Sequence, residues 1–97
     1  MKRKFKNLND VRKSIDKVDN QLVKLIGERE FFVKEALKFK KNKKQIIDKK
    51  RINIVLKRIK NLSKKYKANS LIIERILKLM IKNFIILENK LFKQPKK

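Results

Sequence analysis

The stretch LNDVRKSIDKVDNQLVKLIGERE, residues 8–30, carries the apolar repeat that decides the fold. Its apolar side chains alternate between spacings of three and four residues, at Leu8, Val11, Ile15, Val18, Leu22 and Leu25. This spacing is typical of one face of an amphipathic α-helix and of the seam of a coiled coil. The stretch therefore predicts a long helix with an apolar stripe that packs against other helices.

The repeat continues into GEREFFVKEALKFKK, residues 27–41, where cations occupy positions of the stripe. Arg29 takes the next position of the rhythm, ahead of Phe32 and Ala36. Lys40 lies eleven residues after Arg29, close to three helical turns, so it is predicted to project from nearly the same face. A stripe that accepts an arginine and a lysine needs a negatively charged partner, because an unpaired buried charge is strongly destabilising.

A periodicity near 3.6 residues extends over most of the chain and predicts an all-α fold of three helices. The first is expected over about 8–41, roughly 50 Å long, and the second over about 48–66. The third is expected to begin after Asn69 or Ser70, both good N-caps, and to run to about Phe92. A polar loop, NKKQII, separates the first two helices. We expect one domain over residues 1–97, with its core in about 8–92.

A first helix of this length cannot bury its stripe against two helices of about half its size. The far half would expose its apolar face to water, and the usual remedy is a partner chain. We therefore expect an intertwined homodimer, in which the first helices pair along the stripe.

The composition excludes several classes of chemistry. The 97 residues include no cysteine and no histidine, which excludes disulfides, thiol nucleophiles, the usual zinc sites and a histidine general base. No cofactor or metal is expected. No apolar run approaches the length of a membrane span, and no signal peptide is evident. We expect a cytoplasmic protein, since a chain without cysteine suits a reducing compartment.

The formal charge of +22 has two interpretations. A protein this basic binds phosphate backbones by releasing their counterions, although no motif of a groove-reading, zinc-finger or single-strand RNA binder is present. The chain also contains 25 lysines, 13 isoleucines and 9 asparagines, a bias that an AT-rich genome would impose on any protein. The bias accounts better for the charge, and any nucleic-acid binding is expected to be nonspecific.

Charged residues fall on predicted apolar faces at six positions, which are Arg12, Arg29, Lys40, Asp48, Arg51 and Glu88. Each has an ordinary explanation: Arg12 suits a surface pair with Asp16, and Lys40 can extend its ammonium to water. Together, the four cations in this set exceed its two carboxylates. A bound dianion would supply the missing charge, and arginines suit bidentate carboxylate binding.

The same residues carry a resemblance to a known family. LNDVRKSIDKVDNQLVKLIGERE, followed by VKEALKFK and DKKR, resembles the all-helical (type II) chorismate mutases and the related isochorismate pyruvate lyases, over about residues 8–92. The resemblance implies an intertwined dimer with two sites, each built from both chains. It also implies an isomerase that rearranges chorismate to prephenate in phenylalanine and tyrosine biosynthesis, in the shikimate pathway.

The resemblance further implies roles for individual residues. Arg12 would reach into the site from the partner chain, and Arg29 and Arg51 would clamp the substrate carboxylates. Lys40 would donate a hydrogen bond to the ether oxygen whose bond breaks. Glu88 stands where the family has a glutamine or glutamate facing the same oxygen, and it can donate only when protonated.

Three further positions bear on the choice of substrate. Asp48 matches a family position near the substrate hydroxyl, which favours the mutases. Ile52 stands where many mutases carry a glutamate, and Phe84 stands where some have serine. Apolar residues at these places resemble the lyases, which eliminate pyruvate from isochorismate to make salicylate. The mutase is favoured, with the lyase as the alternative and a small basic nucleic-acid-binding protein as the rival of another class.

Overall fold

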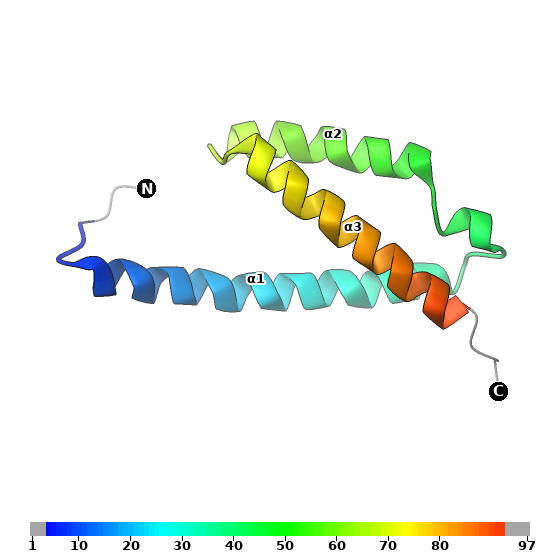
Figure 1. Ribbon diagram of the computed structural model, residues 1–97, viewed down its shortest axis with the longest axis horizontal. Coiled ribbons are helices and arrows are strands. Elements are labelled where there is room, and N and C mark those ends of the chain that lie inside the picture. The colour runs from blue at the N-terminus through cyan, green and yellow to red at the C-terminus, as the bar shows by residue number, and fades with distance from the viewer. Residues whose placement is uncertain (1–3, 93–97) are drawn as a thin grey trace. The chain divides into compact units, whose positions relative to one another are not determined.

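The computed structural model describes residues 4–92, and its regular elements over this range are helices. They are α1 (Leu8–Leu37), the 3₁₀ helix η1 (Lys43–Gln45), α2 (Lys49–Lys65) and α3 (Ser70–Phe92), shown in Figure 1. The all-α prediction of three helices is confirmed. Within residues 4–92, no helix is long and apolar enough to cross a membrane.

The first helix is shorter than predicted, because it ends at Leu37 rather than near Lys41. Its last turn tightens: the amides of Lys38, Phe39 and Lys40 each donate to the carbonyl three residues earlier, at 3.1–3.2 Å. Asn42 then caps η1 by accepting from the Gln45 amide at 3.2 Å. The prediction that Lys40 projects from the helical face of Arg29 was therefore wrong, since Lys40 lies beyond the helix end.

Local capping explains where the other two helices begin. The Asp48 side chain accepts from the Arg51 amide at 3.0 Å, so α2 begins one residue later than its predicted boundary at Asp48. The Asn69 side chain accepts from the Ile72 amide at 3.1 Å and caps α3. Each cap satisfies an amide that the first helical turn leaves without an intrahelical partner.

The chain divides into two compact units, with the boundary between Phe32 and Val33. The first unit contains most of α1, and the apolar stripe along it is open to water. Leu8, Ile15, Val18, Leu22 and Leu25 are 49–61% exposed. No residue of α1, which is described over its whole length, is buried. The stripe is apolar as predicted, but this chain alone does not cover it.

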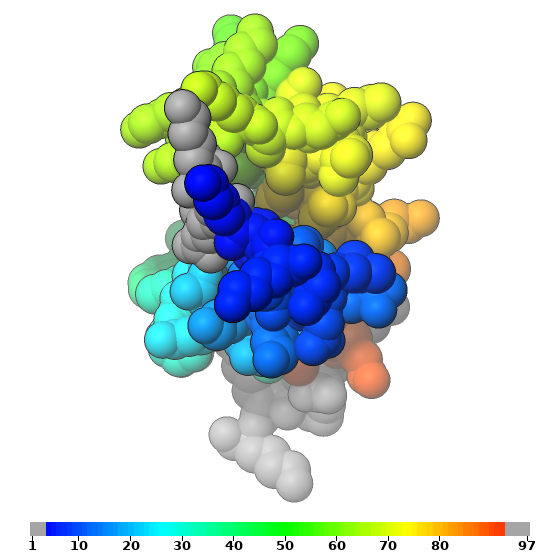
Figure 2. All heavy atoms as spheres, turned by 90° about the vertical axis from the view of Figure 1, so that its left-hand side faces the viewer, coloured from blue at the N-terminus to red at the C-terminus, as the bar shows by residue number. Residues whose placement is uncertain are grey.

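The second unit is built on a hairpin in which α2 and α3 run antiparallel and pack against each other (Figure 1). Val55 of α2 and Phe84 of α3 are buried. Figure 2 looks onto the end where α2 passes into α3, and there the side chains of the two helices meet in continuous contact. The hairpin thus has an apolar core within one chain.

The turn between α2 and α3 has a strained residue at its centre. Lys67 has φ 55°, in the left-handed region that glycine adopts more readily. Its amide donates to Lys64 at 3.2 Å, and the next amide, of Ala68, donates to Ser63 at 2.8 Å. These two bonds form a Schellman motif, which ends a helix sharply and lets the chain reverse.

Candidate active site

An ion pair in the second unit joins a lysine that follows the end of α1 to a buried glutamate of α3. The Lys40 ammonium lies 2.7 Å from a carboxylate oxygen of Glu88. The Glu88 side chain is only 7% exposed, and that of Lys40 is 24% exposed. A carboxylate this deeply buried requires a charged partner or a proton, and Lys40 meets that requirement here.

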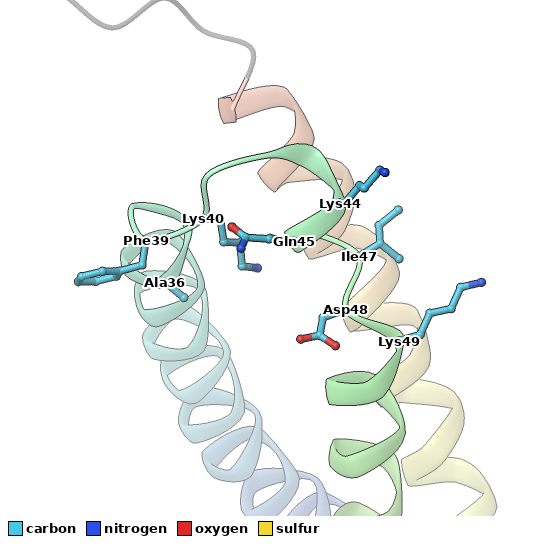
Figure 3. A pocket seen from close by; sticks show the side chains of 8 residues that line it. All are labelled: Ala36, Phe39, Lys40, Lys44, Gln45, Ile47, Asp48 and Lys49. Carbon is cyan, nitrogen blue, oxygen red and sulfur yellow. The ribbon is translucent and has the colours of Figure 1, made fainter.

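Lys40 also lines a hollow of about 690 Å³, together with Ala36, Phe39, Lys44, Gln45, Ile47, Asp48 and Lys49. Figure 3 shows Lys40 and the Asp48 carboxylate projecting toward the opening, whereas Phe39, Lys44 and Lys49 point away from it. The hollow has the size expected for a small-molecule site. The structure therefore places two predicted site residues, Lys40 and Asp48, at one hollow, with Glu88 bonded to the first.

Three more predicted residues lie on the hairpin. Arg51 is exposed, and its position is tied to Asp48 through the helix cap. Ile52 lines a smaller apolar hollow of about 300 Å³ between α2 and α3, with Ile81 and Ile85. Phe84 is buried one turn before Glu88 on α3. The α3 helix thus carries apolar side chains in the turns that precede the buried carboxylate of Glu88.

The two remaining arginines lie on α1 in the first unit. Arg12 is exposed and Arg29 is partly buried. They are 17 residues apart on one continuous helix, a separation of about 25 Å along its axis. This distance exceeds the span of any small dianion. The two arginines of one chain therefore do not bind the same small molecule.

The remaining side chains of the segment between α1 and α2 were not predicted to line the site. Gln45 accepts from the Lys41 amide and donates its own amide to Asn42, so it holds this segment in place beside Lys40. The signal was present in the spacing, because Asn42 and Gln45 have the separation of a capping box. Ala36 lines the hollow because its small side chain leaves space on the last turn of α1.

The arrangement suits binding and polarisation rather than nucleophilic attack. A lysine ammonium beside a hollow binds an anionic or oxygen-rich ligand and donates hydrogen bonds to it. While Lys40 is engaged by Glu88 at 2.7 Å, the carboxylate competes with any ligand for that ammonium. A ligand oxygen therefore gains most from Lys40 when Glu88 carries a proton, and the protonated Glu88 then becomes a second donor.

The profile of the family described as chorismate mutase type II matches residues 11–89. The match spans α2 and nearly all of α1 and α3. No curated protein matches the chain.

Proposed function

The chain belongs to the type II chorismate mutase family, and we propose that it rearranges chorismate to prephenate as a homodimer with shared sites. The observation that carries the proposal is the Lys40–Glu88 pair, 2.7 Å long and beside a hollow of about 690 Å³. By resemblance to the family, both residues would face the ether oxygen of the substrate. Prephenate would then supply phenylalanine and tyrosine biosynthesis.

The proposed reaction is a single pericyclic step. The ether C–O bond of chorismate breaks while a C–C bond forms between the enolpyruvyl arm and the ring, with no net gain or loss of protons. The protein therefore contributes by holding the arm over the ring and by stabilising the charge that develops on the ether oxygen. Lys40 and a protonated Glu88 are suited to donate hydrogen bonds to that oxygen.

The substrate carboxylates are assigned to the arginines. Arg29 and Arg51 would bind them from one chain, and Arg12 would come from the partner chain. The spacing of about 25 Å between Arg12 and Arg29 along α1 supports this division, because only a second copy brings both to one ligand. Asp48, in the Lys40 hollow, would accept from the ring hydroxyl.

The second candidate is isochorismate pyruvate lyase, and the apolar residues at two positions favour it. Ile52 lines an apolar hollow and Phe84 is buried, where many mutases have glutamate and some have serine. In this reaction the same C–O bond breaks, a ring hydrogen moves to the enolpyruvyl carbon, and pyruvate leaves salicylate behind. Asp48 supports the mutase over the lyase.

The deciding experiment offers the purified protein chorismate and isochorismate separately and follows prephenate and salicylate. Prephenate from chorismate, with little salicylate from isochorismate, supports the mutase, and the reverse supports the lyase. The matched variants are Lys40→Gln and Lys41→Gln, which remove one charge each from neighbouring residues. We expect Lys40→Gln to lower kcat by about 10²–10³ and Lys41→Gln, an exposed position, to change it little. Equal rates for the two variants would remove Lys40 from the chemistry.

A further inference from the structure

Among the three long helices, the excess of positive charge is largest on α2. The 17 residues of α2 include six lysines and two arginines but no carboxylate. By contrast, the 30 residues of α1 hold six cations and six carboxylates, so that helix is neutral overall. The helix α3 holds four cations and two carboxylates. A composition bias acting on the whole chain would not leave α1 balanced, so it does not explain the charge of α2.

Four of the six lysines of α2 form a ridge on the side away from its buried apolar residue, Val55. Lys50, Lys57 and Lys64 are spaced by seven residues, so they lie in one row at intervals of about 10 Å. All three are exposed, as are the polar residues beside the row, Asn53, Lys60 and Asn61. We call these six residues the α2 ridge.

The charges of the α2 ridge are not neutralised within their own helix. Elsewhere in the described chain, two exposed lysines pair with a carboxylate one turn away: Lys38 with Glu35 at 2.7 Å and Lys78 with Glu74 at 3.3 Å. In α2 the corresponding contacts are between like charges, for example Lys60 and Lys64, which weaken a helix. Lys49, Lys50 and Arg51 also occupy the first turn, where the helix dipole disfavours cations. Repulsion of this kind destabilises the free helix, and a bound polyanion would offset it.

We propose that the α2 ridge binds the sugar–phosphate backbone of nucleic acids, independently of the proposed catalytic site. A row of exposed ammonium groups releases counterions from a phosphate backbone, while asparagine amides are suited to donate to phosphate and sugar oxygens. An anionic membrane is the weaker match. Binding in a membrane interface requires a broad apolar face beside the charges, and Ile54 is the large apolar residue at the edge of this ridge.

The test measures fluorescence anisotropy of a labelled single strand and a labelled duplex, each about 20 nucleotides long, which covers the site size of small binders. The chain is titrated at several salt concentrations between ~50 and ~200 mM. The ridge variant carries Lys50→Gln, Lys57→Gln and Lys64→Gln. The control carries Lys13→Gln, Lys17→Gln and Lys24→Gln, which remove the same charge from exposed positions on α1 opposite its apolar stripe. Glutamine keeps the helix propensity of lysine, and circular dichroism verifies the fold of both variants.

The ridge variant is expected to bind about 100-fold more weakly at ~100 mM salt. The slope of log K against the logarithm of the salt concentration is expected to become shallower by about two to three. The control is expected to lose less than about threefold, and the two probes reveal whether the site prefers single strands or duplex. Equal losses for the two variants would overturn the proposal, because only net charge would then matter. Tight binding to phosphatidylserine vesicles with none to either oligonucleotide would also overturn it.

Discussion

The first helix and the hairpin that follows it bury their apolar residues in different ways. The hairpin uses its own two helices, so that Val55 and Phe84 are buried within the second unit. In contrast, α1 leaves five residues of its stripe 49–61% exposed. Yet α1 is amphipathic, as are the two helices of the hairpin. Regular amphipathicity therefore predicts which face of a helix is packed against another element. It does not predict whether that element belongs to the same chain.

The two regions also divide the predicted site. The hairpin unit holds Lys40, Asp48, Arg51 and Glu88, with the buried ion pair among them. The first unit holds Arg12 and Arg29, far apart on one helix. Under the proposed function, α1 would supply its two arginines to two different binding sites.

Complementation between two inactive variants tests the division most directly. Arg12→Ala and Arg29→Ala are each expected to lower kcat/KM by about 10³ or more, because a desolvated carboxylate would lose a charged partner. In a co-refolded equal mixture, half the dimers are mixed, and each mixed dimer contains one intact site. Activity is therefore expected to recover to about a quarter of that of the unaltered protein.

The control for this experiment is a mixture of Arg12→Ala with itself, refolded in the same way, which should remain inactive. Circular dichroism and size-exclusion chromatography check that each variant still folds and associates. If the mixture of the two variants stays as inactive as its components, Arg12 and Arg29 act within one chain and the shared site is wrong.

A charge in the middle of the exposed stripe is expected to separate the chains. Leu22→Glu places a carboxylate on the stripe, which a paired helix would have to desolvate. Analytical ultracentrifugation should show monomer, with activity reduced by about 100-fold or more because each site would lose the partner's arginine.

Asn20→Glu is the matched control for the stripe. It adds the same charge two residues away, at an exposed position on the opposite face of α1, and should leave association unchanged. If the Leu22→Glu protein still associates and is active, the apolar stripe of α1 is not the interface between the two chains.

The pH dependence of the reaction tests the chemistry of the hairpin. Glu88 is bonded to Lys40 at 2.7 Å, and it can donate to the substrate only when protonated. The activity of the unaltered protein is therefore expected to fall as pH rises. Glu88→Gln donates at every pH, so its profile should be flat over the same range.

Glu74→Gln serves as the control, since it removes a carboxylate from the partly exposed pair with Lys78. That variant should keep the profile of the unaltered protein. A Glu88→Gln protein with the original slope would assign the pH dependence to another group.

The smallest expected effect concerns the turn of the hairpin. Lys67→Gly removes the strain of φ 55°, and we expect it to stabilise the fold by about 0.5–1 kcal/mol, after the added freedom of the unfolded chain is subtracted. Lys65→Gly, two residues earlier in the last turn of α2, should destabilise by about 1 kcal/mol. Urea unfolding measures both, and a loss of stability in Lys67→Gly would show that the lysine side chain itself stabilises the turn.

Local chemistry explains which element boundaries were predictable. Asp48 and Asn69 accept amides of the helices that follow them, and both could be identified as caps from their residue type. The end of α1 was not predictable in this way. Lysine is a good helix former, so the lysine-rich run after Leu37 gives little indication of where the helix stops, and the cap at Asn42 competes with its extension.

In the candidate site, too, the residue types were predictable from the sequence, whereas contacts between distant residues were not. The residue types at Arg12, Arg29, Lys40, Asp48, Arg51 and Glu88 were identified from charges on apolar faces and from family similarity. The bond between Lys40 and Glu88 was not predicted, because it joins residues 48 positions apart and depends on the chain leaving the helix before Lys40. Gln45 was missed for a related reason, since its place depends on how the segment between α1 and α2 folds.

The helical class, the caps and the apolar faces were predictable because they depend on periodicity and on groups within one or two turns. The length of the first helix likewise indicated that one chain leaves its stripe exposed. The burial of Glu88 against Lys40 was seen only in the folded chain. Burial and pairing are properties of distant segments meeting in space. The pattern of residue types shows which side chains each segment offers, whereas the packing of the segments determines which of these side chains come into contact.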